Sequence, residues 1–284
     1  MKAAAFDYVA AGSLAQAIDL QRGGGAQLMG GSQSLGPMLN LRLARPARVL
    51  DISRVPELCT VEGRGEWIEI GAAVTHAMIE DGVHAALKGH PMQQVAAGIA
   101  YRSIRVRGTL GGSLAHADPA ADWVVVMPAL NARVVLASAR GTREVAASDF
   151  MIGAYTTVKE PDEVITSVKV PRLSPSARWG YHKLCRKPGE FADASAAIRF
   201  EAERGEATVV LGAVERAPVR LEGLARRLLT EPDVDPTRAD LTEAVKQALP
   251  DRDRIDVQRY AICLERALGH AGIRVRSPAA GASR

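Results

Sequence analysis

Two short glycine-centred segments constrain this 284-residue chain more than any other feature. The first loop is Gly30-Gly31-Ser32-Gln33-Ser34-Leu35, and the second loop is Thr109-Leu110-Gly111-Gly112-Ser113. Glycine lets backbone N–H groups approach an anion without a Cβ in between, and hydroxyls add further donors. Neither loop has the spacing of a Rossmann loop or a P-loop, and each alone is weak evidence, because glycine pairs usually mark ordinary turns. Together they could hold both halves of a pyrophosphate, so a dinucleotide such as FAD or NAD is the first hypothesis.

Cysteine and histidine spacing gives no sign of a metal centre. Cys59, Cys185 and Cys263 are far apart, and no two of them form a C-x-x-C pair. Their odd number and spacing argue against a disulfide framework and against an iron–sulfur or zinc site in this chain. The six histidines include no i,i+4 pair and no H-E-x-x-H motif. We therefore expect no metal ligand here.

The apolar pattern bears on where the chain resides. No segment approaches the ~18 consecutive apolar residues of a membrane span. The N-terminus begins like a signal peptide, but Asp7 and Gly12 interrupt its apolar stretch, so we interpret it as mature protein. We expect a cytoplasmic chain with no membrane span.

Basic residues outnumber acidic ones, which gives a net charge of +4. The basic residues are nevertheless spread along the chain, and only four Phe and five Tyr are available for stacking, so we expect no nucleic-acid partner. The densest basic group is Arg102, Arg105 and Arg107, and its alternation with Ile104 and Val106 predicts a strand or turn with one solvated face. Contact of these arginines with a partner subunit or with phosphates is the alternative.

Periodicity and turn residues predict a mixture of strands and helices. Ser13 is expected to cap a helix over 14–21, and Thr75 to cap another. Strands are expected over 26–29, 49–52, 67–70, 133–138, 163–170, 194–200 and 207–214, and further helices over 90–100, 238–249 and 257–269. The last helix has Tyr260, Leu264 and Leu268 as its expected buried stripe. Because strands and helices do not alternate strictly, an α+β fold is favoured over a doubly wound α/β fold.

The flanks of the two loops make the pair specific. The first loop continues as Gly36-Pro37-Met38-Leu39-Asn40-Leu41-Arg42-Leu43-Ala44-Arg45-Pro46, and the second as Leu114-Ala115-His116-Ala117-Asp118-Pro119-Ala120-Ala121-Asp122. With the segment Tyr181-His182-Lys183-Leu184-Cys185-Arg186-Lys187-Pro188-Gly189-Glu190-Phe191-Ala192, they resemble the FAD-binding (medium) subunit of the molybdenum hydroxylases, the xanthine dehydrogenase and carbon monoxide dehydrogenase family. The resemblance covers almost the whole chain.

The first loop departs from the family pattern A-G-G-[QH]-S-L at two positions, whereas the second loop fits without departure. Gly30 replaces the alanine, and Ser32 replaces the second glycine. Serine adds a Cβ, so we expect the backbone at Ser32 to avoid a glycine-only conformation.

The resemblance implies an architecture that periodicity alone would not reveal. It comprises two N-terminal FAD-binding subdomains of the vanillyl-alcohol-oxidase/PCMH type, followed by a C-terminal domain with a small antiparallel sheet and helices. In this chain we assign the FAD-binding subdomains to 1–56 and 57–174, the C-terminal domain to 175–276, and a disordered tail to 277–284.

The resemblance assigns the FAD pyrophosphate to both loops. Backbone amides of residues 31–35 and 111–113 would hold it, assisted by the hydroxyls of Ser34 and Thr109. The loop candidates for cofactor binding are Gly30, Gly31, Ser32, Gln33, Ser34, Leu35, Thr109, Leu110, Gly111, Gly112 and Ser113. On this hypothesis, Gly111→Val causes near-complete loss of FAD while the fold is largely kept.

Five further cofactor-binding candidates follow from the resemblance, each with a structural alternative. Asp122 would bond sugar or ribityl hydroxyls, or else cap a helix. Ile165 would lie near the flavin or adenine, or else in a strand core, and Phe191 would cover the isoalloxazine ring, or else lie in the core. Lys183 would lie near the flavin and favour its anionic reduced form, or else be a surface lysine. His116 would contact the cofactor, or else be a hydrogen-bonded structural residue.

The function implied is electron transfer, with no catalytic acid or base in this chain. A large molybdopterin subunit would hydroxylate the substrate, and two [2Fe–2S] clusters on a small iron–sulfur subunit would pass electrons to non-covalent FAD here. An external electron acceptor would then reoxidise the flavin, and the complex is expected to be a dimer of heterotrimers. Two alternatives stay open: a stand-alone FAD oxidase of the vanillyl-alcohol-oxidase fold, and a cofactor-free basic interaction module.

Overall fold

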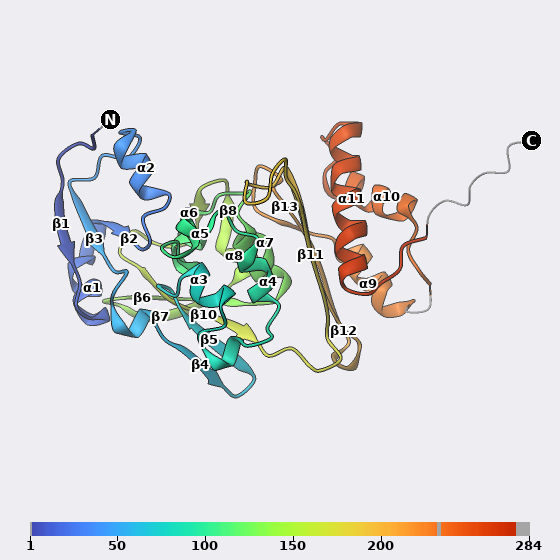
Figure 1. Ribbon diagram of the computed structural model, residues 1–284, viewed down its shortest axis with the longest axis horizontal. Coiled ribbons are helices and arrows are strands. Elements are labelled where there is room, and N and C mark those ends of the chain that lie inside the picture. Colours follow the sequence, from blue (N-terminus) through green and yellow to red (C-terminus); the bar gives the residue numbers. More distant parts are fainter. Residues whose placement is uncertain (1, 232–233, 277–284) are drawn as a thin grey trace, which may run out of the picture. The chain divides into compact units, whose positions relative to one another are not determined.

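The computed structural model describes residues 2–231 and 234–276, which form two compact units (Figure 1). The first unit comprises the chain up to Asp118 together with Ala132–Arg172. The second comprises Pro119–Asn131 together with the described residues from Leu173 onward. The tail predicted to be disordered, residues 277–284, lies outside the described residues. The division at residues 56 and 174 stays a prediction.

The first unit begins with a small parallel sheet in which strands and helices alternate. Its strands β1 (Asp7–Ala10), β2 (Gln27–Met29) and β3 (Arg48–Asp51) lie in the order β1-β3-β2. Helix α1 (Leu14–Leu20), capped by Ser13 as predicted, and helix α2 (Leu35–Asn40) connect them. Ala17 of α1 and Leu50 of β3 are fully buried in the same core. Strands and helices alternate within this segment, because parallel strands need crossover connections, although they do not alternate strictly along the whole chain.

The rest of the first unit is built on an antiparallel sheet of order β4-β5-β10-β6-β7 (Figure 1). Its strands are β4 (Val61–Arg64), β5 (Trp67–Gly71), β6 (Arg133–Ser138), β7 (Gly141–Ala146) and β10 (Val164–Pro171). The other elements are α3 (His76–Glu80), α4 (Met92–Ala97), α5 (Arg102–Arg105), α6 (Leu110–His116), α8 (Ala147–Phe150), β8 (Met151–Gly153) and β9 (Thr156–Thr157). Short 3-10 helices are η1 (Arg22–Gly24), η2 (Pro56–Leu58) and η3 (Ala85–Leu87), with η4 (Ala202–Arg204) in the second unit. This antiparallel sheet makes the fold α+β, as predicted.

The prediction of a strand or turn over residues 102–107 is wrong for Arg102–Arg105, which form the short helix α5, whereas residues 106–107 lie in a turn. Arg102 pairs with Asp81 at 2.6 Å, and Arg105 pairs with Glu80 at 2.8 Å. These carboxylates lie at the end of α3, so both arginines point to one side, which a two-residue repeat cannot provide. Arg107 is exposed and makes no ion pair with a described residue.

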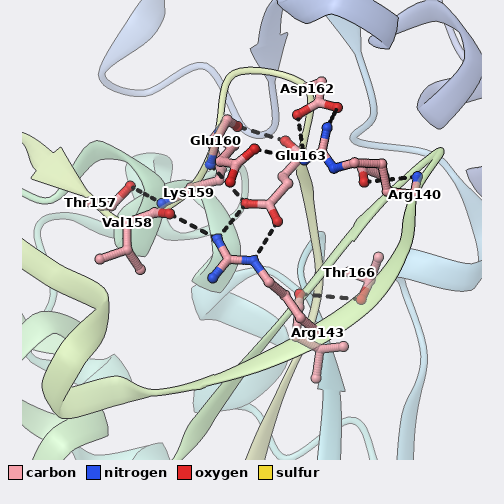
Figure 2. Close-up of polar contacts among 11 residues, drawn as sticks. Arg140, Arg143, Thr157, Val158, Lys159, Glu160, Asp162, Glu163 and Thr166 are labelled. Carbon is pink, nitrogen blue, oxygen red and sulfur yellow. Dashed lines mark hydrogen bonds and ion pairs between the residues drawn. The ribbon is translucent and has the colours of Figure 1, made fainter.

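A cluster of ion pairs holds the loop between β9 and β10 against β7 (Figure 2). Arg143 Nε lies 2.6 Å from Glu163 Oε1, and Arg140 lies 2.7 Å from Glu160. Burial alone would raise the pKa of Glu163, but its hydrogen bonds to Arg143 and to the Glu160 N–H outweigh burial and lower it. Burial lowers the pKa of Lys159, whose Nζ donates to two carbonyl oxygens of the same loop. The loop that leads into β10 is therefore rigidly anchored.

The second unit is an antiparallel sheet of order β11-β12-β13-β14 (Figure 1). Its strands are β11 (Arg178–Leu184), β12 (Ala194–Glu201), β13 (Glu206–Gly212) and β14 (Val219–Arg220). Its helices are α7 (Asp122–Ala129), α9 (Glu222–Thr230), α10 (Arg238–Ala248) and α11 (Arg254–His270). Tyr260, Leu264 and Leu268 of α11 are buried in the core with β12 and β13, which confirms the predicted stripe.

No helix in the described ranges is both long and apolar enough to cross a membrane.

Candidate functional site

The two glycine loops lie against each other in the first unit. A Cβ built on Gly31 would overlap the carbonyl oxygen of Arg107, and it would lie 2.8 Å from the Cα of Gly108. A Cβ on Gly30 would lie 2.8 Å from Thr109 Oγ1. Gly31 is therefore required because another backbone segment approaches too closely for a side chain, whereas Gly30 faces the side chain of Thr109.

The first loop leaves its backbone donors unpaired. The N–H groups of residues 31–35 donate to no acceptor within residues 2–231 and 234–276, and neither does the Ser34 hydroxyl. Gln33 Nε2 donates to the carbonyl oxygen of Gly31 at 2.9 Å, so this carbonyl group is hydrogen-bonded within its own loop. A run of free N–H groups at the start of a helix is an anion-binding arrangement.

The expectation for Ser32 is wrong. Its φ is 60°, in the left-handed region that favours glycine, rather than in the ordinary range for serine. A left-handed residue within such a loop turns successive N–H groups toward one side, as in an anion-binding nest. Serine accepts this conformation at a cost of about 1 kcal/mol.

The second loop, by contrast, uses the backbone donors of residues 110–113 within the fold. Leu110 N–H donates to Val74 at 3.0 Å, and Gly111 N–H donates to Ala72 at 2.9 Å. Thr109 caps α6: its Oγ1 accepts from the Gly112 N–H at 3.1 Å, and its carbonyl oxygen accepts from Ser113. The Thr109 hydroxyl thus accepts a hydrogen bond as a helix cap, which leaves its O–H donor available to a phosphate.

Gly111 is a structural glycine in this arrangement. A Cβ on it would lie 2.5 Å from the Cβ of Ala72 and 2.9 Å from the Ala72 carbonyl oxygen. A valine there must displace the backbone beside β5. The expectation that Gly111→Val spares the fold therefore has no support in this packing.

Three polar side chains meet in the second unit. Asp122 accepts from Tyr181 Oη at 2.7 Å, and its Oδ1 lies 3.0 Å from Lys183 Nζ. The side chains of Asp122 and Lys183 are 7% and 11% exposed. Burial raises the pKa of Asp122 although Lys183 and Tyr181 act to lower it, and burial with the nearby Asp122 raises the pKa of Tyr181 well above its ordinary value.

This geometry decides two of the structural alternatives. The surface-lysine interpretation of Lys183 is wrong, because its ammonium group is buried and paired. The helix-cap interpretation of Asp122 is also wrong, because Ala121 is the N-cap and Asp122 is the first residue of α7. Sequence reasoning missed Tyr181, although its spacing of two from Lys183 on β11 places both side chains on one face.

The other candidates are dispersed. Ile165 is buried in β10 opposite Leu136, as the strand-core alternative expects. Phe191 is 64% exposed, so the core alternative is wrong for it. His116 ends α6, with its ring 5.2 Å from that of Tyr155. The loops, Ile165 and His116 belong to the first unit, whereas Asp122, Lys183 and Phe191 belong to the second.

No group of three or more His, Cys, Asp or Glu side chains in the described part of the chain is arranged to hold a metal ion. The three cysteines are free thiols. The unpaired donors of the first loop fit instead a phosphate-containing ligand such as FAD, because a pyrophosphate offers acceptors to several N–H groups at once.

Comparisons with known proteins agree with this fit. Residues 4–173 match the family described as the FAD binding domain in molybdopterin dehydrogenase. The nicotine 6-hydroxylase medium subunit of Paenarthrobacter nicotinovorans is 36% identical over 245 residues, covering 84% of this chain and 85% of that protein. The carbon monoxide dehydrogenase medium chain of Hydrogenophaga pseudoflava is 34% identical over 229 residues, covering 79% of this chain and 80% of that protein.

Solved structures extend the likeness to both units. Carbon monoxide dehydrogenase from Hydrogenophaga pseudoflava superposes with a TM-score of 0.87 at 29% identity, covering 96% of this chain and 99% of that chain. Quinoline 2-oxidoreductase from Pseudomonas putida 86 superposes with a TM-score of 0.84 at 30% identity, with the same coverage of 96% and 99%. The chain therefore belongs to the family of FAD-binding medium subunits of the molybdenum hydroxylases.

Proposed function

We propose that this chain is the FAD-binding electron-transfer subunit of a molybdenum-containing hydroxylase or dehydrogenase. It would take electrons from [2Fe–2S] clusters on a small subunit and deliver them through FAD to an external acceptor. The observation that carries this proposal is the run of unpaired backbone N–H groups at residues 31–35, in a chain of this family. FAD, when bound, supplies the electron-accepting and electron-donating chemistry.

The two loops would contribute different groups to cofactor binding. The first loop supplies backbone N–H groups and the Ser34 hydroxyl to the pyrophosphate. The second loop supplies the Ser113 hydroxyl and, at the exposed Gly112, a surface without a side chain, because the Gly112 N–H is already bound to Thr109 Oγ1. Leu110 and Gly111 are buried and support this loop. His116 and Ile165 are retained as cofactor contacts on the resemblance alone.

Asp122, Lys183 and Phe191 would act on the flavin. The Asp122 carboxylate lies beside the Lys183 ammonium, so Lys183 presents an ion pair rather than an isolated cation. Its influence on an anionic reduced flavin would therefore be weaker than that of a free lysine. Phe191 is exposed and so is free to cover a planar ring.

The same proposal extends to assembly. Partner subunits would carry the molybdopterin cofactor and both iron–sulfur clusters, in a cytoplasmic dimer of heterotrimers. The chain would have three parts, with FAD-binding subdomains over 1–56 and 57–174 and a C-terminal domain over 175–276. The medium-subunit names of its relatives support a place in a complex with other subunits.

The test is to purify the complex and the single chain in parallel. The complex should contain FAD, iron and molybdenum, and acid precipitation should release the flavin, because no histidine or cysteine lies in a recognisable attachment motif. The single chain should bind FAD yet fail to reduce it with any organic substrate. Substrate-dependent flavin reduction without iron or molybdenum would establish a stand-alone oxidase instead, and a colourless single chain that takes up no FAD would favour a cofactor-free module.

A further inference from the structure

One arginine on α5 ties together the segments on which the first loop rests. Arg105 donates from Nε and Nη2 to the Glu80 carboxylate at 2.8 and 3.0 Å. Its Nη1 donates to the carbonyl oxygens of Ile99 and Ala100, both at 2.9 Å. The side chains of Arg105 and Glu80 are only 12% and 19% exposed. A planar guanidinium used in this way fixes the end of α3 and the turn before α5 in one geometry.

Helix α5 leads directly into the backbone that contacts the first loop. The N–H groups of Arg107 and Gly108 donate to the carbonyl oxygen of Ile104 at 3.1 and 2.8 Å. The carbonyl oxygen of Gly108 in turn accepts from the His76 N–H at 2.9 Å. Residues 107–108 are therefore held from α5 on one side and from α3 on the other, and the Glu80–Arg105 pair links these two helices.

The first loop has no free space against this segment. A Cβ on Gly31 would overlap the Arg107 carbonyl group and would also clash with the Gly108 Cα, at 2.8 Å. Because packed interiors do not absorb displacements, any shift of residues 107–108 moves Gly31 and the free donors that follow it. Backbone donors bind an anion well only when they lie within about 0.5 Å of the positions that the bound anion requires.

We propose that Glu80 and Arg105 form a positioning pair that sets the geometry of the first loop, and through it the affinity for a pyrophosphate-containing cofactor, without touching that cofactor. The inference rests on the proposed function, because it takes the first loop as the FAD pyrophosphate site. Four of the five N–H donors of Arg105 are already used, so we remove it from the candidates for direct contact with phosphates or a partner.

The neighbouring pair Arg102–Asp81 provides a matched control. It joins the same two helices, with side chains that are 49% and 45% exposed. Among the described residues, Arg102 makes side-chain contacts with the carboxylates of Glu80 and Asp81 and with no backbone carbonyl. Asp81→Asn therefore removes a charge from this surface and leaves the anchor of residues 99–108 intact.

The experiment measures two quantities for the full-length apoprotein: the dissociation constant for FAD by flavin fluorescence titration, and the thermal unfolding midpoint. Arg105→Lys keeps the charge but loses the planar fork, and Glu80→Gln keeps the shape but loses the charge. Both should weaken FAD binding about tenfold or more, and the double variant should lose little beyond either single one. Asp81→Asn should stay within about twofold of wild type.

A purely stabilising role predicts a different pattern. Both variants would then unfold at lower temperature, yet bind FAD like wild type well below that temperature, and this result would overturn the positioning role. Failure of even the conservative Glu80→Gln to fold would overturn it too, because the pair would then serve folding as a whole. A wild-type chain that binds no FAD would instead contradict the proposed function itself.

Discussion

The two glycine loops look alike in sequence but differ in where their backbone donors go. The second loop donates to Ala72, to Val74 and to its own cap Thr109, whereas residues 31–35 donate to no acceptor in the described ranges. Glycine serves close packing in both loops, at Gly31 against Arg107 and at Gly111 against Ala72. A glycine-rich segment can thus bind an anion through its backbone only when its N–H groups are not already hydrogen-bonded within the fold.

The largest effect on FAD affinity is expected for Gly31→Ala, which disrupts the packing of the first loop against residues 107–108. Its Cβ would overlap the Arg107 carbonyl oxygen, so the loop must move, and its N–H groups would no longer point toward one bound anion. We expect FAD affinity, measured by fluorescence titration, to fall by about 100-fold or more. Gly12→Ala is the control, because a Cβ there meets only Gln16 Oε1, at 3.5 Å. Wild-type affinity in Gly31→Ala would show that the first loop is not the site.

Gly111→Ala should act on stability before it acts on binding. The new Cβ would meet Ala72 at 2.5 Å, and relieving this overlap should lower the free energy of unfolding by about 1–3 kcal/mol in urea titrations. Gly223→Ala, at an open helical position, should instead gain up to about 1 kcal/mol. If Gly111→Ala keeps full stability but loses FAD, the second loop is a direct ligand and the contrast between the loops disappears.

Ser34→Ala separates binding from folding. The hydroxyl has no partner among the described residues, so its loss should change the free energy of unfolding by less than about 0.5 kcal/mol. If it donates to a phosphate, FAD binding should weaken by about tenfold. The exposed Ser103→Ala should change neither quantity. Equal FAD affinities for the two variants would remove Ser34 from the site.

The smallest effect is expected at Ser32, where the backbone is left-handed. Comparing Ser32→Gly with Ser32→Ala removes the hydroxyl in both and isolates the Cβ. The glycine variant should be more stable than the alanine variant, because glycine adopts the left-handed backbone without strain. The difference should be about 1 kcal/mol at most, because glycine also increases the entropy of the unfolded chain and so offsets part of the gain. An alanine variant as stable as the glycine variant would argue against the left-handed geometry.

Much of the fold could be predicted from local patterns, since Ser13, Thr75 and the stripe at Tyr260 act on their own helices. Contacts between distant segments could not. Nothing local relates Gly31 to Arg107. The alternating arginines indicated a strand or turn, because their partners Glu80 and Asp81 lie in a distant part of the sequence. The loop motifs identified the candidate site, but only the hydrogen-bond pattern distinguished free donors from engaged ones.

Hydrogen–deuterium exchange of the full-length chain, with and without FAD, tests this distinction most directly. In the apoprotein, amides 31–35 should exchange quickly and amides 110–113 slowly, because only the latter are hydrogen-bonded within the fold. Saturating FAD should slow exchange in the first loop by about tenfold or more and change the second loop little. Strong protection by FAD confined to residues 110–113 would contradict the account.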